Sequence, residues 1–151
     1  MYDTILVPLD GSKRAERILP HVEELAQRFG AKVILLRVVD PAPYYAGPEG
    51  GVVALQSELD RRTKEAETYL AALQDEYEGK GIEARTRIDF DRVVQAILDA
   101  AESEGADLIA MASHGRTGLS QVFYGSVAAG VLHRVDRPLL LVHSSDEERS
   151  E

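Results

Sequence analysis

Short apolar segments alternate with stretches of helical periodicity along the whole chain. Continuous runs of aliphatic and β-branched side chains predict four strands of a parallel sheet. These runs span residues 4–7, 32–39, 107–112 and 139–142. In residues 82–88, apolar side chains alternate instead with Glu83, Arg85 and Arg87. A period of two with charges on one side predicts a further strand at a sheet edge, with one solvated face.

Apolar residues at helical spacing predict a helix after each strand except the last. The expected helices span residues 18–29, 55–77, 94–101 and 126–135. We expect Asp10 or Ser12 to cap the first helix and Asp91 to cap the third, because short polar side chains accept hydrogen bonds from the first turn. Pro20 lies inside the first pattern and removes one backbone donor, which predicts a kink.

This alternation predicts a three-layer, doubly wound α/β domain with a five-stranded parallel sheet and right-handed crossovers, a Rossmann-like fold. The alternating strand and the last strand are expected at the edges, which gives the strand order 3-2-1-4-5. Strands one and four are then neighbours at the topological switch point, where open parallel sheets bind ligands. We therefore expect residues 8–12 and 111–118 to face each other across a crevice.

The 151 residues suffice for one domain, which we place at residues 1–143. Residues 144–151 form a polar, acidic tail that we expect to be disordered. Residues 40–51 contain three prolines, three glycines and two tyrosines, which break all periodicity. Such a segment is either a lid or partner contact, or a mobile surface loop.

The composition of the chain excludes several classes of partner and of metal site. The 17 Lys and Arg residues against 26 Asp and Glu residues give a net charge of −9, and the basic residues do not cluster, which argues against nucleic-acid and anionic-membrane partners. No cysteine is present, so disulfides and thiolate metal sites are excluded. His21, His133 and His143 lack the spacing of metal ligands. The N-terminal apolar run is neither a signal peptide nor long enough to span a bilayer, so we expect a cytoplasmic protein.

Small residues between the fourth strand and the fourth helix would let backbone N–H groups approach an anion. Ser126 stands at the expected helix N-terminus, where the helix dipole is positive. These small residues are Ala112, Ser113, Gly115, Gly118 and Gly125. The pattern suits phosphate, although such glycines also serve as plain turn formers and Ser126 as a plain N-cap. No Gly-x-Gly-x-x-Gly or Gly-Lys-Ser/Thr motif is present, which disfavours dinucleotide and P-loop sites.

Three segments resemble the universal stress protein family, particularly its ATP-binding branch. They are Ile-Leu-Val-Pro-Leu-Asp-Gly-Ser at residues 5–12, residues 107–111, and Ser113-His114-Gly115 followed after nine residues by Gly125-Ser126. The resemblance spans essentially the whole chain and implies an adenine nucleotide alpha hydrolase-like form of the fold. Where the family loop begins with glycine, this chain has Ala112. The extra methyl group matters if the backbone there needs a positive φ or must touch a phosphate.

The resemblance implies a site for an adenine nucleotide. Pro8, Leu9 and Asp10 would border the adenine and ribose, with the Asp10 carboxylate accepting a hydrogen bond from a ribose hydroxyl. Val38 would pack on the base. The remaining implied residues line the ribose and phosphates: Met111, Ala112, His114, Gly115, Arg116, Gly125, Ser126 and Val127. Asp10 has an alternative as a helix cap and Arg116 as a solvated charge, and we interpret His114 as a loop residue rather than a general base.

The favoured function is a stress-response protein that holds ATP, ADP or AMP as a regulatory ligand, with Mg²⁺ carried in by ATP near Asp10. We expect little or slow hydrolysis, because the loop offers no lysine and no positioned base. The alternatives are a nucleotide-free protein that acts through dimerisation and partner contacts, and a slow ATPase or nucleotidyl transferase that uses Asp10 and His114.

The last strand predicts a homodimer, which is consistent with the family. Leu139, Leu140, Leu141 and Val142 are apolar and uncharged. At a sheet edge, their free backbone groups would invite pairing with a second copy.

Overall fold

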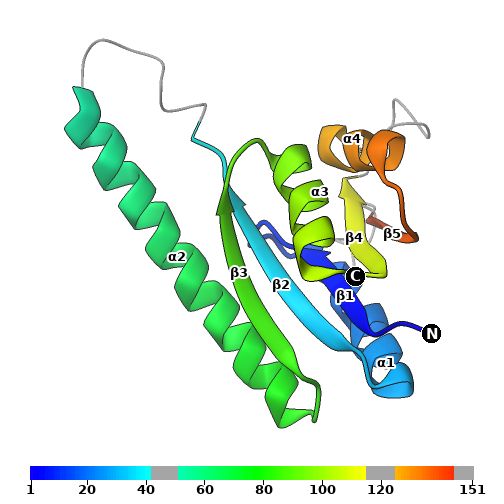
Figure 1. Ribbon diagram of the computed structural model, residues 1–151. Helices are drawn as coiled ribbons and strands as arrows, with labels where there is room; N and C mark the ends of the chain where they lie inside the picture. Colours follow the sequence, from blue (N-terminus) through cyan, green and yellow to red (C-terminus); the bar gives the residue numbers. More distant parts are fainter. Residues whose placement is uncertain (42–50, 115–124, 145–151) are drawn as a thin grey trace, which may run out of the picture.

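The predicted three-layer α/β fold is confirmed by a computed structural model that describes residues 1–41, 51–114 and 125–144 (Figure 1). The elements follow in the order β1 (Thr4–Pro8), 3-10 helix η1 (Ala15–Ile18), α1 (Leu19–Phe29), β2 (Lys32–Val39), α2 (Gly51–Gly79), β3 (Ala84–Phe90), α3 (Val93–Glu104), β4 (Leu108–His114), α4 (Ser126–Arg134) and β5 (Leu139–Ser144). The strands are parallel, and their order is β3-β2-β1-β4-β5.

The sheet separates two hydrophobic layers. On one face, α1 and α2 pack through Val22, Leu70 and Tyr77. On the other face, α3 and α4 pack through Ile97 and Val131. Residues next to each other along a strand point to opposite faces, so each inner strand supplies side chains to both layers. This explains why the inner strands are mostly apolar on both faces, with Arg37 of β2 as an exception.

Strand β1 lies at the centre of the sheet. It pairs with β2 from Thr4, opposite Lys32, to Pro8, opposite Leu36. On its other side it pairs with β4 at Ile5 and Leu6. The strand order reverses at β1, as expected: β2 and β3 follow on one side of it, and β4 and β5 follow on the other side.

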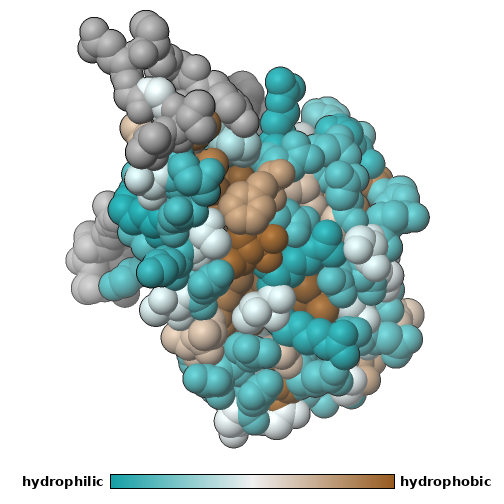
Figure 2. Space-filling model, turned by 60° about the vertical axis from the view of Figure 1, so that its left-hand side comes forward, coloured by the Kyte–Doolittle hydropathy of each residue, from teal (hydrophilic) through white to brown (hydrophobic). Residues whose placement is uncertain are grey.

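The two edge strands differ in character. Arg85 and Thr86 of β3 are exposed, and Arg87 forms ion pairs with Asp89 at 2.8 Å and Glu104 at 3.1 Å. Figure 2 brings the α2 and β3 side of the molecule forward and shows mostly hydrophilic residues around a central hydrophobic hollow. Residues 139–142 of β5, in contrast, are apolar and half-buried.

The kink expected at Pro20 is absent from helix α1, so this prediction was wrong. The α-helix begins at Leu19, so Pro20 occupies its first turn, and the preceding residues form the separate 3-10 helix η1. A first-turn N–H has no partner inside the helix, so proline costs nothing there and its fixed φ suits the helix start. Pro20 therefore starts α1 instead of bending it.

Three further boundaries differ from expectation. Asp91 does not cap α3: Arg92 is the N-cap residue, and the Asp91 carboxylate accepts a hydrogen bond from the Arg92 N–H at 2.7 Å. Strand β5 continues to Ser144, which is fully buried, so the expected tail begins one residue too early. Gly51 opens α2, four residues before the expected helix, whereas residues 42–50 and 145–151 lie outside the described chain.

Asp107 joins the amino ends of β1 and β4. Its carboxylate accepts hydrogen bonds from the N–H groups of Asp3 at 2.8 Å and Thr4 at 3.2 Å, and its own N–H donates to the Thr4 carbonyl at 3.0 Å. These bonds fix the start of the central strand against its neighbour. The side chain therefore continues the sheet pairing beyond the last backbone pair.

We expect Asp107→Ala to lower the free energy of unfolding by about 1–3 kcal/mol, because hydrogen bonds to a charged group are lost. Asp107→Asn should lower it by less, since one acceptor oxygen remains. Urea unfolding followed by circular dichroism measures both. Asp75→Ala, on the exposed face of α2, is the matched control and should change it by less than about 0.5 kcal/mol. Equal effects at positions 75 and 107 would show that the Asp107 carboxylate does not stabilise the sheet.

Candidate functional site

A cavity of about 410 Å³ opens where the carboxyl ends of β1, β2 and β4 meet the start of α4. Its size falls within the usual range for small-molecule sites, roughly 300–1,000 Å³. Its walls include most of the residues proposed from the sequence: Pro8, Leu9, Asp10, Val38, Met111, Ala112, Gly125, Ser126 and Val127. His114 ends β4, but its side chain is outside the described part, as are Gly115 and Arg116.

The sequence proposals missed several lining residues. Ala15, Leu36, Val93, Ile97 and Ala128 also contact the cavity. Leu36 could have been found, because it lies two positions before Val38 and so points to the same face of β2. Val93 and Ile97 are four residues apart on α3, which gave only a core signal in the sequence. Their part in the cavity depends on where α3 crosses the sheet.

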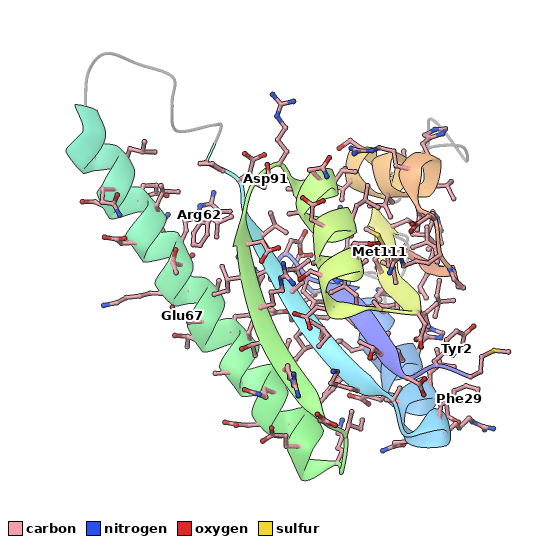
Figure 3. The ribbon with its side chains drawn as sticks, in the orientation of Figure 1. Tyr2, Phe29, Arg62, Glu67, Asp91 and Met111 are labelled. Atoms are coloured by element: carbon pink, nitrogen blue, oxygen red, sulfur yellow. The ribbon has the colours of Figure 1, made fainter. Side chains whose placement is uncertain are left out.

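The floor of the cavity is apolar. Leu36 and Val38 of β2 and Met111 of β4 point to the face covered by α3 and α4. Figure 3 shows Met111 between β4 and α3. Ile97 adds an aliphatic wall. A flat, largely apolar group such as a purine base matches this floor better than a phosphate does, because burying unpaired charge is unfavourable.

One wall is the turn that follows β1. The Asp10 carboxylate accepts the Ser12 N–H through Oδ1 at 2.8 Å, and the Ser12 hydroxyl accepts the Ala15 N–H at 3.2 Å. Ser12 therefore reaches the first turn of η1, while Asp10 closes the turn before it. Among the hydrogen bonds within the described chain, none uses Asp10 Oδ2. This oxygen is available to a hydroxyl donor in the cavity.

The opposite wall is the N-terminus of α4. Gly125 is the N-cap residue with φ 78° and ψ 156°, a conformation that favours glycine. Ser126 is therefore the first helical residue rather than the N-cap, and in the described part of the chain no side chain caps this end. The first N–H groups of a helix lack internal partners and carry the positive end of its dipole. This wall is therefore suited to phosphate or carboxylate.

Ala112 has ordinary strand backbone. In β4 it pairs with Val142 of β5, and every positive φ among the described residues belongs to a glycine. The methyl group that replaces the family glycine therefore brings no backbone strain. The Ala112 methyl group can therefore affect a bound ligand only by touching it.

The cavity carries little charge of its own. Asp10 is the one charged side chain among the lining residues, so lysine and arginine are missing from the part of the wall that the structure describes. Over the same part of the chain, no group of three or more His, Asp or Glu side chains could hold a metal ion. The donors available to an anion are therefore backbone N–H groups and the Ser126 hydroxyl.

Where helices are described, none is long and apolar enough to cross a membrane.

Ser113 lies beside the cavity without facing it. Its side chain is 1% exposed, and its hydroxyl is 3.3 Å from Nδ1 of His143, its neighbour across the β4–β5 pairing. The contact links the end of β4 to the exposed edge strand. Ser113 therefore acts in the sheet, whereas Ala112 next to it borders the cavity.

Comparison with known proteins identifies clear relatives. The model of the Universal stress protein family matches residues 1–143. Universal stress protein MJ0577 of Methanocaldococcus jannaschii is 32% identical over 94% of this chain and 95% of its own length. The solved structure of MJ0577 superposes with a TM-score of 0.82, at 33% identity, over 97% of this chain and 99% of that chain.

Two further solved structures are similar. Universal stress protein UspA from Lactobacillus plantarum has a TM-score of 0.79 and 26% identity, over 93% of this chain and 97% of that chain. A universal stress protein solved in complex with cAMP has a TM-score of 0.67 and 25% identity, over 95% of this chain and 98% of that chain.

Helix α4 is held in place by a close contact with α3. A Cβ atom at Gly130 would lie 2.7 Å from Cγ2 and 3.4 Å from Cγ1 of Val94. Glycine here lets the two helices approach each other below the cavity. Valine is stiff at χ1, so it cannot easily move aside.

We expect Gly130→Ala to lower the free energy of unfolding by about 1–3 kcal/mol through overpacking, although alanine is the better helix former. Thermal and urea unfolding measure the effect. Gly79→Ala is the matched control, since a Cβ there meets nothing within 4 Å; it should leave stability unchanged or raise it by up to about 1 kcal/mol. If both variants were stabilised, the close contact between α3 and α4 would be refuted.

Proposed function

The chain belongs to the universal stress protein family, and from this membership we propose that it binds an adenine nucleotide, ATP in the first place, as a regulatory ligand. One observation carries the proposal: an apolar cavity at the switch point has, as far as residues 1–41, 51–114 and 125–144 show, a free carboxylate oxygen on one wall and an uncapped helix N-terminus on the other. The relative solved with cAMP supports an adenine nucleotide as the class of ligand.

The proposed orientation follows from the chemistry of the walls. The base packs on Val38 and the apolar floor, where little polar surface would lose water. The ribose lies beside Asp10, whose Oδ2 accepts a hydroxyl hydrogen bond. The phosphates lie at the start of α4, against the N–H groups that follow Gly125 and the Ser126 hydroxyl.

The other residues implied by the family loop complete the proposal. Leu9 and Pro8 border the adenine and ribose, and Met111 and Ala112 line the ribose and phosphates, as Val127 does beside Ser126. His114, Gly115 and Arg116 are proposed near the ribose and phosphates on the resemblance alone. Because Ala112 has unstrained backbone, the departure from the family glycine gives no separate support to a nucleotide-free protein.

Binding without rapid hydrolysis is the expected behaviour. Phosphoryl transfer is accelerated by cations placed against the developing charge and by a positioned nucleophile. The described lining residues contain Asp10 as the one carboxylate and no lysine. Mg²⁺ commonly binds one or two carboxylates together with substrate phosphates and water, so Asp10 has the chemistry to hold an Mg²⁺ that arrives with ATP.

We also propose that two copies pair through β5. Its residues 139–142 are apolar and half-buried, and among the described strands β5 has no partner on its outer side. The opposite edge, β3, carries Arg85, Arg87 and Asp89, and charges of this kind discourage edge pairing. A two-fold pair of β5 strands would bury the apolar side chains of both copies.

The nucleotide proposal predicts measurable binding. Isothermal titration with ATP and AMP, with and without Mg²⁺, should show a saturable site, and denaturing freshly purified protein should release any nucleotide for mass spectrometry. Asp10→Ala should weaken ATP binding about 10- to 100-fold, because a hydrogen bond to a charged group is lost. Asp75→Ala, which is distant from the cavity, should not. Well-folded protein that binds neither nucleotide would refute the proposal.

The dimer proposal predicts a mass of two chains. Light scattering should give twice the 16.6 kDa of one chain at micromolar concentration. Val142→Lys places a charge on the proposed interface and should reduce the mass to one chain while the circular dichroism spectrum stays unchanged. Thr86→Lys on β3 is the control and should leave the mass unchanged. A single-chain mass for the unaltered protein would count against pairing through β5.

A further inference from the structure

Arg37 lies behind the floor of the cavity. Its neighbours Leu36 and Val38 point into the cavity, so the Arg37 side chain points to the opposite face of β2, toward α2. Its guanidinium carbon lies 5.5 Å from the centre of the Tyr69 ring on α2, a cation–π contact. Within the described residues Arg37 forms no ion pair with a carboxylate, and its buried Nε has no hydrogen-bond partner. The guanidinium is therefore held by contacts other than charge pairing.

The guanidinium also lies directly against the turn after β1. Gly11 has φ 86°, and a Cβ atom there would collide with Nη1 of Arg37 and lie 3.6 Å from Cζ and 4.0 Å from Nη2. The backbone conformation therefore requires glycine, and a Cβ atom would in addition force the guanidinium end of the Arg37 side chain to move. Gly11 sits between Asp10 and Ser12, the two residues whose hydrogen bond closes the turn.

Tyr69 belongs to the same neighbourhood. Its hydroxyl is buried and lies close to the Glu16 carboxylate, without a well-aligned hydrogen bond in the described part of the chain. Burial raises the pKa of Tyr69, and the nearby carboxylates of Glu16 and Asp10 raise it further. The ring therefore stays neutral and presents its electron-rich face to Arg37. Tyr69, Arg37 and the turn form one continuous series of contacts from α2 to the cavity wall.

We propose that Arg37 is a positioning residue for the nucleotide: it supports the turn at Gly11 from behind, so that the Asp10 carboxylate meets the ribose hydroxyls, and it links that turn to Tyr69. The proposal rests on the proposed nucleotide function and deepens it. Arg37 does not touch the ligand, because β2 separates it from the cavity. Its effect must therefore appear as a loss of ribose recognition.

The planar shape of the side chain is central to this role. A guanidinium can lie flat on an aromatic ring and against a peptide turn at the same time, whereas the compact ammonium of lysine cannot fill both contacts. Lysine at position 37 would keep the charge and lose the support. Methionine at position 37 would lose both the positive charge and the support of the turn.

The first test measures ribose selectivity. Titrations with ATP, 2′-deoxy-ATP and 3′-deoxy-ATP should show that the unaltered protein prefers ATP by about tenfold or more over at least one deoxy form, the effect of one hydrogen bond to a charged group. Arg37→Met and Arg37→Lys should reduce this preference toward one, while binding of that deoxy form changes little. Asp10→Asn sets the reference for lost ribose recognition. Arg85→Met, an exposed arginine on β3, should keep the full preference.

The second test separates the ring from the hydroxyl of Tyr69. Tyr69→Phe keeps the cation–π contact and should retain the ribose preference. Tyr69→Leu removes the ring face and should reduce the preference as Arg37→Met does. If Tyr69→Phe alone reduced it, the link would run through the hydroxyl and the proposed contact would be wrong.

A double-mutant cycle tests the contact at the turn. Gly11→Ala should weaken ATP binding about tenfold or more in the unaltered protein, but by a smaller factor in Arg37→Met, because the collision with the guanidinium is gone. If the two substitutions weakened ATP binding by factors that simply multiply, the proposed contact between Gly11 and Arg37 would be wrong. The thermal midpoint of each variant shows whether it is folded.

A measurement without nucleotide distinguishes the two proposals. Hydrogen exchange at the Ser12 amide, which Asp10 protects, should become about tenfold faster in Arg37→Met and stay unchanged in Arg85→Met. Unchanged exchange together with an unchanged ribose preference would overturn the positioning role. If the unaltered protein binds no ATP, the proposed function fails and the role toward ribose fails with it, while faster exchange would still show that Arg37 supports the turn.

Discussion

Strand β1 must satisfy its backbone hydrogen bonds on both sides at once, with β2 and with β4. Because both partners are parallel to it, the chain cannot return by a tight turn and has to cross over through helices. The crossover after β1 runs to the α1 and α2 face, and the crossover after β4 runs to the α3 and α4 face. The two connections diverge, and the cavity opens between them. The position of the site is therefore a consequence of strand order, and its chemistry is left to the two connections.

Those connections differ in chemistry. After β1, the turn is closed by side chains: Asp10 accepts from Ser12, Ser12 accepts from Ala15, and Gly11 fits against Arg37. At the start of α4, Gly125 leaves the backbone donors uncapped by any side chain in the described residues. One wall thus presents a carboxylate whose position is fixed, and the other presents N–H groups that no side chain of the described residues caps. A ligand with hydroxyls at one end and phosphates at the other complements both walls.

The hydrophobic pattern was sufficient to predict the sheet order and the switch point, because an inner parallel strand must be apolar on both faces and β3, with its charges, could only be an edge. It also brought residues 8–12 and 111–118 to one crevice and placed Ser126 at a helix start, whereas Val38 and Val127 were implied only by the family resemblance. Local rules failed where two neighbouring residues competed for one role. Asp10 and Ser12 were equal candidates for the cap, but only Ser12 reaches the first turn of η1, and Pro20 begins a helix because the residues before it form a separate 3-10 turn. Ile97 and Arg37 were beyond reach, because their roles arise from how α3 and α2 cross the sheet.

The unequal edges of the sheet bear on how far assembly can go. A sheet with two adhesive edges can add copies at either side and extend without limit, as fibres do. Here the hydrophilic β3 edge resists pairing, while β5 is apolar. A molecule with one edge that can pair forms a two-fold dimer and stops there, because the dimer interface covers that edge in both copies. In the dimer proposed above, the charges of β3 would therefore end the assembly at two copies.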